Sequence, residues 1–430
     1  MSDVKVFKFG GASVSTADGF KNVANIIKTY ANQKLVVVIS AIGKTTNALE
    51  KLLQSYISQS DDTKSLLANI RNNHIDIITS LGISDKSCLE DIHDTMVELD
   101  WILDEDPNQD FDYLYDQIVS LGEMLSSKIL FYYLKHQSTN PEWLDVRDVI
   151  ITDSTFRDAR VQWDITAQNV THKVPLMFQN TNLIVTQGFI GSTLQNETTT
   201  LGREGSDYTA AIFSYCMDAH SMHIWKDVPG VLTGDPKLFD EVAKLPRLSY
   251  REAIEMTYYG AKVIHPKTIK PLQNKQIPLY VRPFSDVNSV GTLISDVQEV
   301  VYPPIIVIEP DQCLIHISTK DFSFVAEHHL SKIFALISKH RLKVNMMRNT
   351  AISFTVCVHQ ILERIEKFQA DVQDEFKTLR DDDLELITIR HFTPDIVKDM
   401  KRNKLILFEE RLSDTVQIVT KSLPSMKLKE

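Results

Sequence analysis

The sequence predicts a layered α/β protein that carries a smaller α+β region at its C-terminal end. Up to about residue 272, short apolar runs alternate with segments of helical periodicity, an order typical of helices packed on both faces of a mainly parallel sheet. From about residue 299 the order becomes strand, helix, strand, strand, helix, strand, which is the ferredoxin-like motif. We therefore expect a three-layer αβα sandwich followed by a ferredoxin-like region.

The sandwich is expected to span residues 1–298. It begins with a strand at residues 4–9 and a helix whose apolar positions recur between residues 20 and 30. Residues 35–40 form a continuous apolar run of the kind buried in a parallel sheet. Residues 60–135 are predicted to be an almost wholly helical insertion, interrupted at 104–107 by an acidic, solvated loop.

The second half of the sandwich contributes strands at residues 149–152, 183–189 and 220–226. Helices are expected to begin near Ser206 and near Ser249. Ser206 is suited to be an N-cap, and Ser249 forms a capping box with Glu252.

The C-terminal region, residues 299–430, is expected to hold one full ferredoxin-like unit at about 311–390. Its elements are predicted at residues 313–318, 327–340, 344–348, 352–358, 361–376 and 384–389. Two further strands follow, at 405–408 and 415–420. The strand-like residues 300–308 have no partner in this count. We expect them to pair with the tail, so that 299–310 and 391–430 make a partial second unit.

The composition excludes several classes of protein. The chain has 430 residues, of which 46 are basic and 57 acidic, and its net charge of -11 argues against a nucleic-acid or membrane-surface role. Its four cysteines are widely spaced, so neither a disulfide framework nor a zinc site is expected. The thirteen histidines show no metal-ligand spacing. No signal peptide or membrane span is recognisable, and we expect a cytoplasmic protein.

The first strand carries the first chemical signal. Lys8 lies within an apolar run and is followed at once by Gly10 and Gly11. A buried ammonium group requires an anionic partner, and paired glycines let the backbone approach a ligand closely. Free N–H groups beside a lysine suit an anion, so this strand predicts a phosphate site, although a lysine at a strand end is often simply solvated.

A second glycine-lysine pair does not make a P-loop. Gly43-Lys44-Thr45 follows a strand and precedes a helix, but the first glycine of that motif would fall at Val38. The loop at 40–47 can still offer hydroxyl and amide donors to a ligand.

Three later turns add further candidates. Arg203 precedes a clear helix and could hold a carboxylate with its two-pronged guanidinium, although a solvent-facing arginine is an equal alternative. Residues 226–236 form a turn-rich loop after a strand, where α/β sheets bind ligands. Lys262 lies between two helices, with Pro266 suited to the first turn of the second, and is a candidate second phosphate lysine.

These blocks, in this order, resemble the aspartate kinases of the amino acid kinase family. The matching blocks are residues 8–14, 40–47, 122–123, 200–208, 226–236 and 260–266. The C-terminal motif is similar to the ACT modules that bind amino-acid effectors in that family.

The resemblance implies ATP-dependent phosphorylation of the L-aspartate side-chain carboxylate to 4-phospho-L-aspartate, the first step toward lysine, threonine and methionine. A carboxyl group with a pKa of about 3.9 is already ionised at pH 7, so no general base is required. Catalysis then consists of positioning and charge neutralisation. The expected cofactor is ATP with Mg²⁺, without a metal site built from protein side chains, and the expected assembly is a homodimer through the ACT-like region.

The resemblance also implies roles for individual residues. The catalytic set is Lys8, Asp207 and Lys262. The ATP-binding set is Lys8, Gly10, Gly11, Ser13, Lys226, Asp227, Gly230, Asp235 and Lys262. The aspartate-binding set is Ser40, Thr46, Glu123, Arg203 and Ser206.

The chain departs from the family pattern at several positions. Glu204 stands where a glycine is usual, and Lys226, Leu232 and Lys237 replace common residues on the nucleotide side. In the regulatory half, His328-His329 and Asn345 depart from the usual residues, so the effector stays open. The alternatives are an amino acid kinase for another carboxylate, such as acetylglutamate, or an inactive amino-acid sensor. A kinase half of a fused dehydrogenase is disfavoured because no dinucleotide fingerprint is present.

Overall fold

The computed structural model describes residues 3–261, 264–298, 300–321 and 323–422. The chain divides into two compact units. The first unit comprises residues 1–231, 244–257 and 262–300, and the second comprises 232–243, 258–261 and 301–430. Each unit is described by itself.

The first unit is built on an eight-stranded sheet in the order β3-β4-β2-β1-β7-β9-β10-β8. The strands are β1 (Val4–Phe9), β2 (Lys34–Ile39), β3 (Pro141–Leu144), β4 (Leu183–Gln187), β7 (Ser221–Lys226), β8 (Arg247–Ser249), β9 (Leu279–Pro283) and β10 (Thr292–Ser295). All neighbouring pairs are parallel except β9 with β10. Lys8 of β1 lies opposite Val38 of β2 and Ile224 of β7, so it belongs to a central strand.

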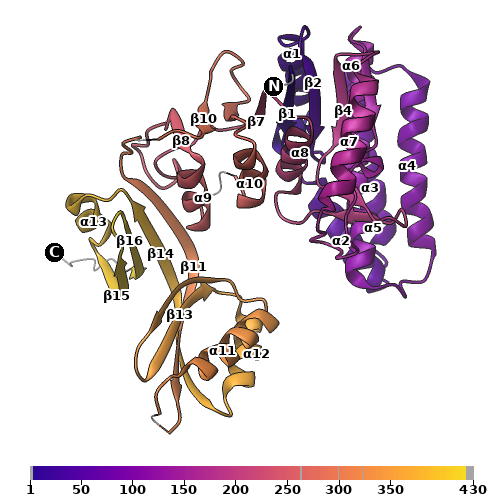
Figure 1. The fold of residues 1–430 in the computed structure, drawn as a ribbon. Helices are drawn as coiled ribbons and strands as arrows, with labels where there is room; N and C mark the ends of the chain where they lie inside the picture. The colour runs from indigo at the N-terminus through magenta and orange to yellow at the C-terminus, as the bar shows by residue number, and fades with distance from the viewer. Residues whose placement is uncertain (1–2, 262–263, 299, 322, 423–430) are drawn as a thin grey trace, which may run out of the picture. The chain divides into compact units, whose positions relative to one another are not determined.

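Helices cover the two faces of this sheet (Figure 1). The crossover from β1 through α1 (Ala17–Lys28) to β2 runs one way across the sheet, and that from β4 through α8 (Gly205–Cys216) to β7 runs the other way. Because such crossovers are right-handed, α1 and α8 lie on opposite faces. The helix α6 (Leu121–His136) packs with α1, and α7 (Trp163–Met177) packs with α8. The predicted three-layer α/β sandwich is therefore confirmed.

The remaining elements of the first unit are mostly helical. Between β2 and α6 the chain forms α2 (Thr45–Ile57), α3 (Thr63–Leu81), α4 (Lys86–Asp104) and α5 (Phe111–Val119). Later come α9 (Tyr250–Tyr258) and α10 (Pro266–Asn274), with Pro266 in the first turn as expected. Short elements complete the unit: 3-10 turns at Gly11–Val14 and Val146–Asp148, and the hairpin of β5 (Ile190–Ser192) and β6 (Thr198–Thr200).

Two local predictions for the first unit were wrong. Residues 149–152 form no strand but only isolated bridges, Ile151 with Ser192 and Thr152 with Val161, because β3 already occupies the edge beside β4. Ser206 is not the N-cap of α8. The helix begins at Gly205, two residues earlier than that cap implies, because the carbonyl of Glu204 accepts the N–H groups of Asp207 and Tyr208 at 3.0 and 3.2 Å, which makes Glu204 the cap and places Ser206 in the first turn.

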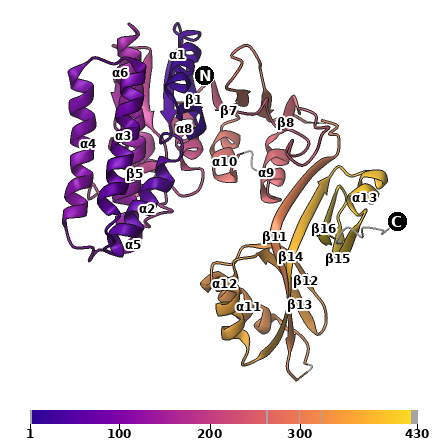
Figure 2. The ribbon, with the colours of Figure 1, turned by 180° about the vertical axis from the view of Figure 1, so that it is seen from behind.

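The second unit is a six-stranded antiparallel sheet in the order β12-β13-β11-β14-β16-β15. Its elements are β11 (Ile305–Thr319), α11 (Glu327–Lys339), β12 (Val344–Asn349), β13 (Ser353–His359), α12 (Leu362–Val372), β14 (Phe376–Arg390), α13 (Pro394–Met400), β15 (Lys404–Arg411) and β16 (Thr415–Ser422). Figures 1 and 2 show α11 and α12 together against one end of this sheet, with α13, β15 and β16 at the other. The predicted strand–helix–strand–strand–helix–strand order is present.

The two 15-residue strands join these ends into one sheet. We expected residues 300–308 to pair with the tail, but residues 305–308 open β11 and pair with β14, which in turn pairs with β16. A bulge between Glu309 and Gln312, where Asp311 has a φ of 54°, marks the junction. Because a bulge adds twist without ending a strand, β11 contributes to both ends of the sheet.

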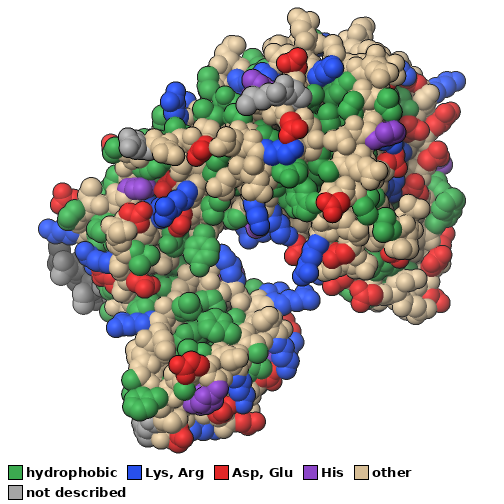
Figure 3. Space-filling view, viewed as in Figure 1, with side chains coloured by type: hydrophobic (Ala, Val, Ile, Leu, Met, Phe, Trp, Pro, Cys, Tyr) green, Lys and Arg blue, Asp and Glu red, His purple; other side chains and the backbone are tan. Residues whose placement is uncertain are grey.

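The surface of each unit is mixed in charge. On the face drawn in Figure 3, acidic and basic side chains lie interspersed over both units. No helix in the described part of the chain has both the length and the apolar character required to cross a membrane.

Candidate active site

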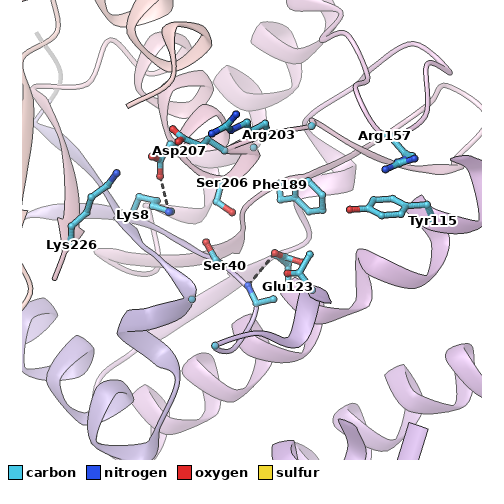
Figure 4. Close-up of a pocket in the computed structure, with 17 residues that line it drawn as sticks. Lys8, Ser40, Tyr115, Glu123, Arg157, Phe189, Arg203, Ser206, Asp207 and Lys226 are labelled. Carbon is cyan, nitrogen blue, oxygen red and sulfur yellow. Dashed lines mark hydrogen bonds and ion pairs between the residues drawn. The ribbon is translucent and has the colours of Figure 1, made fainter. Parts of the chain in front are cut away.

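A pocket of about 500 Å³ opens in the first unit where β1, β2 and β7 end (Figure 4). Carboxyl ends of parallel strands are where such sheets bind ligands, since the connections diverge there. The structure brings nine of the predicted site residues into its lining: Lys8, Gly11, Ser40, Thr46, Glu123, Arg203, Ser206, Asp207 and Lys226. They come from five separate stretches of sequence.

Lys8 and Asp207 form an ion pair at one end of this pocket, with 2.7 Å between Nζ and Oδ1. Asp207 is 3% exposed and stands in the first turn of α8, where the helix dipole favours a negative charge. Burial alone would raise the pKa of its carboxyl group. The charges of Lys8 and Lys226, with the hydrogen bond from Lys8, outweigh burial and hold that pKa below its usual value. This end of the pocket therefore combines two lysines with one ionised aspartate.

Glu123, in the first turn of α6, is also buried, but its surroundings differ. Its Oε1 accepts the N–H of Ala41 at 3.1 Å, and its Oε2 has no hydrogen-bond partner among the described residues. Burial raises the pKa of Glu123 to about 8, against the opposing effects of that hydrogen bond and of the Lys8 charge. An unpartnered carboxyl oxygen on a residue that lines a pocket is suited to receive a cationic group of a ligand.

Position 11, in the turn after β1, requires a glycine. A Cβ atom there would lie 2.8 Å from the carbonyl oxygens of both Ala41 and Gly43. The N–H of Gly43 donates to the carbonyl of Gly11 at 3.0 Å. The turn after β1 and the loop after β2 are therefore in direct backbone contact, which no larger residue would permit.

The other predicted residues lie outside the lining. Gly10 is adjacent, since a Cβ there would lie 3.5 Å from Nζ of Lys8, and Ser13 is buried in the following turn. Asp227 and Gly230 belong to the loop after β7. Asp235 belongs to the second unit, where its Oδ1 accepts the N–H of Lys237 at 2.9 Å. Lys262 lies outside the described residues.

Three lining residues were not predicted from the sequence: Tyr115, Arg157 and Phe189. The Arg157 guanidinium lies 4.5 Å from the centre of the Tyr115 ring and pairs with Asp112 at 3.0 Å. Its backbone is left-handed, with a φ of 69°, and its N–H donates to both carboxylate oxygens of Asp116. The polar residues at 153–158 are the sequence signal for this turn, which is not among the predicted ligand-binding turns.

The amino acid kinase family matches this chain over residues 3–283. The chain belongs to that family. The lysine-sensitive aspartokinase 3 of Escherichia coli K12 is 31% identical over 357 residues, which cover 82% of this chain and 78% of that relative. The chain is therefore placed among the aspartokinases.

Other relatives are longer than this chain. Aspartokinase 1, chloroplastic, of Arabidopsis thaliana is 30% identical over 82% of this chain and 62% of its own length. The bifunctional aspartokinase/homoserine dehydrogenase of Buchnera aphidicola is 29% identical, and the match covers 87% of this chain but 47% of that protein.

Solved structures give the same picture. Escherichia coli aspartokinase III in complex with aspartate and ADP, in its R-state, has a TM-score of 0.84 and 25% identity, covering 97% of this chain and 96% of its own. The same enzyme with lysine and aspartate, in its T-state, has a TM-score of 0.81. The similarity extends over both units.

Proposed function

We propose that this protein transfers the γ-phosphoryl group of ATP to the side-chain carboxylate of L-aspartate, giving 4-phospho-L-aspartate. The observation that carries the proposal is one cavity lined by two sets of charged groups. Lys8, Lys226 and the ionised Asp207 form the first set, and Arg203 and the buried Glu123, whose Oε2 has no hydrogen-bond partner among the described residues, form the second. The first set suits phosphate, and the second suits the α-carboxylate and α-ammonium of an amino acid.

The proposed reaction needs no base from the protein. The aspartate carboxylate attacks the γ-phosphorus, the bond from that phosphorus to the bridging oxygen breaks, and ADP leaves with the electron pair. Lys8 and Lys262 are proposed to stabilise the negative charge on the transferring group, and Asp207 to orient Lys8 through their ion pair. Gly10, Gly11, Ser13, Lys226, Asp227, Gly230 and Asp235 are proposed to bind ATP. Ser40, Thr46, Glu123, Arg203 and Ser206 are proposed to bind aspartate.

Mg²⁺ is proposed to enter with the nucleotide. Within the described residues, no three His, Cys, Asp or Glu side chains gather to hold a metal ion. Asp207, which lines the pocket, is already paired with Lys8. Bound to the phosphates, Mg²⁺ would offset their charge, as it does where substrate phosphates supply most of its ligands.

The assembly and location belong to the same proposal. Residues 1–298 are taken as the catalytic domain, with residues 60–135 as its helical insertion, and 299–430 as the regulatory region. A homodimer is proposed through the second unit, whose sheet ends in the edge strands β12 and β15. Light scattering should give twice the mass of one chain, and the mass of a single chain would exclude the proposed homodimer. Four buried, unpaired cysteines support a cytoplasmic location.

Hydroxylamine trapping tests the reaction itself. Hydroxylamine converts an acyl phosphate to a hydroxamate, so ATP-dependent hydroxamate should form with L-aspartate. N-acetylglutamate is the matched negative substrate. Product with N-acetylglutamate alone would identify a different carboxylate kinase, and no product with either would indicate an inactive homologue.

A further inference from the structure

Glu204 has an unusual backbone for its residue type. Its φ and ψ are 54° and 30°, which is the left-handed region, and it forms the cap directly before α8. A side chain is disfavoured there relative to glycine, because Cβ crowds the following carbonyl. Strained residues of this kind persist where the surrounding structure holds them, and they cluster at functional sites.

The Glu204 side chain makes a long-range contact that glycine could not make. Its Oε2 accepts the N–H of His265 at 2.8 Å, across 61 positions of sequence. His265 is the N-cap of α10, and its Nδ1 accepts the N–H of Lys267 at 3.2 Å. Glu204 thus binds the residue that starts α10, three positions after Lys262 in the sequence.

A second contact fixes the same segment. Lys267 pairs with Asp158, which neighbours the pocket residue Arg157. The turn that contains Glu204 and the turn that contains Asp158 therefore each bind the start of α10.

Glu204 lines a pocket that we assign to anionic substrates, where a free carboxylate would repel them. The hydrogen bond from the N–H of His265 leaves that charge in place but holds Oε2 at the start of α10, which gives this carboxylate a structural role in the pocket. Its neighbour Arg203 is the residue proposed to hold the α-carboxylate of aspartate.

We propose that Glu204 is a positioning residue that fixes the start of α10, three positions after Lys262 in the sequence, to the aspartate-binding turn. This inference rests on the proposed phosphoryl transfer. Through this contact, ordering of the turn by aspartate also orders the start of α10, so bound aspartate strengthens nucleotide binding.

Three variants test the role. Glu204→Gly removes both the contact and the backbone strain, Glu204→Ala removes only the contact, and Glu204→Gln keeps an acceptor oxygen. We expect Glu204→Gly to lower kcat by about tenfold to a hundredfold, the range for a misplaced catalytic group, while its Tm stays level or rises. Glu204→Gln should restore most of the lost kcat. Gln59→Gly, at another left-handed position with a φ of 50°, is the matched control and should leave kcat unchanged.

Calorimetry adds a readout that does not depend on turnover. ADP affinity, measured with and without L-aspartate, should increase with aspartate in the wild type and lose that increase in Glu204→Gly. The inference would be overturned if Glu204→Gly kept both a normal kcat and the normal increase of ADP affinity with L-aspartate. It would also be overturned by a Glu204→Gln variant as poor as Glu204→Ala, because the charge would then matter, or by a Glu204→Gly variant that loses kcat and Tm together. A wild type that forms no hydroxamate would instead refute the proposed reaction, while the ADP measurement would still test the contact.

Discussion

Asp207 and Glu123 line one pocket, yet their carboxyl groups have different surroundings. Asp207 lies against Lys8, which favours its ionised form. Glu123 is buried with a single backbone donor, which favours its protonated form until a cation arrives. Two acidic groups in one site thereby suit different tasks, because charge partners and burial act on each separately.

Lys8→Ala should reduce kcat by at least about a hundredfold, the scale for losing one preorganised charge at a transition state. The variant also leaves Asp207 buried without its closest partner, so its unfolding should be measured alongside the hydroxamate assay. Lys5→Ala, on the same strand but outside the pocket, is the control and should keep kcat near the wild-type value. Near-normal turnover in Lys8→Ala would remove Lys8 from the catalytic role.

Aspartate binding should strengthen as the pH rises from about 6 to about 8. In the substrate-free protein the pKa of Glu123 is about 8, so below that pH the side chain is mostly protonated. It must release its proton to pair with the substrate's α-ammonium. The KM for L-aspartate should therefore fall with rising pH, by at most about tenfold per unit, and level off above the pKa. Glu123→Gln should give a high KM without this slope, and a flat wild-type profile would contradict the assignment.

Among the elements, Asp116 of α5 connects three parts of the first unit. Its buried carboxylate accepts the N–H of Arg157, the N–H of Thr200 at 2.8 Å and the hydroxyl of Thr200 at 2.6 Å. Burial raises the pKa of Asp116 to about 6, although these hydrogen bonds oppose the shift. One side chain thus holds α5, β6 and the turn that places Arg157 in the pocket.

Asp116→Asn should lower the free energy of unfolding by about 1–3 kcal/mol, because the amide has one acceptor oxygen and leaves buried donors unpaired. Asp112→Asn, on the same helix, is the matched control. It breaks only the half-exposed pair with Arg157, whose contribution should be at most about 1 kcal/mol. Urea unfolding measures both. Equal losses in the two variants would show that Asp116 does not hold these elements together.

At the scale of the whole molecule, the second unit includes two segments that interrupt the first in sequence, residues 232–243 and 258–261. The N–H of Ile306 in β11 donates to the carbonyl of Thr233 at 2.8 Å, and Arg390 of β14 lies 5.8 Å from the centre of the Tyr259 ring. The first segment contains Asp235, and the second directly precedes Lys262. We therefore expect substitutions in β11 and β14 to alter the conformation of the proposed nucleotide-binding loops.

Gly260→Ala tests this connection. Gly260 has a φ of 98°, and a Cβ atom there would lie 2.4 Å from Cδ of Glu309. Gly82→Ala is the control, since its φ is 69° and nothing lies within 4 Å. The control should lose about 1–2 kcal/mol of stability from backbone strain alone. Gly260→Ala should lose more and should lower kcat.

A double variant separates the two contributions in Gly260→Ala. Adding Glu309→Ala removes the side chain that the new methyl group would displace. The stability loss should then fall to that of the control, as a double-mutant cycle would report. An additive result would show that Glu309 does not constrain this segment.

Several parts of the fold and the site could be predicted from local sequence. The strands at 4–9 and 35–40 were placed within a residue, because continuous apolar runs have few other ways to be buried. Helical periodicity predicted the helices of 60–135, and the spacing of Lys8, Gly10 and Gly11 predicted a ligand-binding turn. Each of these signals depends only on residues that lie close together in the sequence.

Other features were decided by contacts between distant residues. The apolar residues 149–152 form no strand because β3 occupies the sheet edge, and the left-handed Glu204 is held by a residue 61 positions away. Tyr115, Arg157 and Phe189 join the pocket only when α5, the turn at 153–158 and the end of β4 meet. The sequence therefore determined the central strands β1, β2, β4 and β7, the family and most of the charged groups, while the tertiary structure decided their charge states and contacts, because burial and long-range hydrogen bonds exist only in the folded chain.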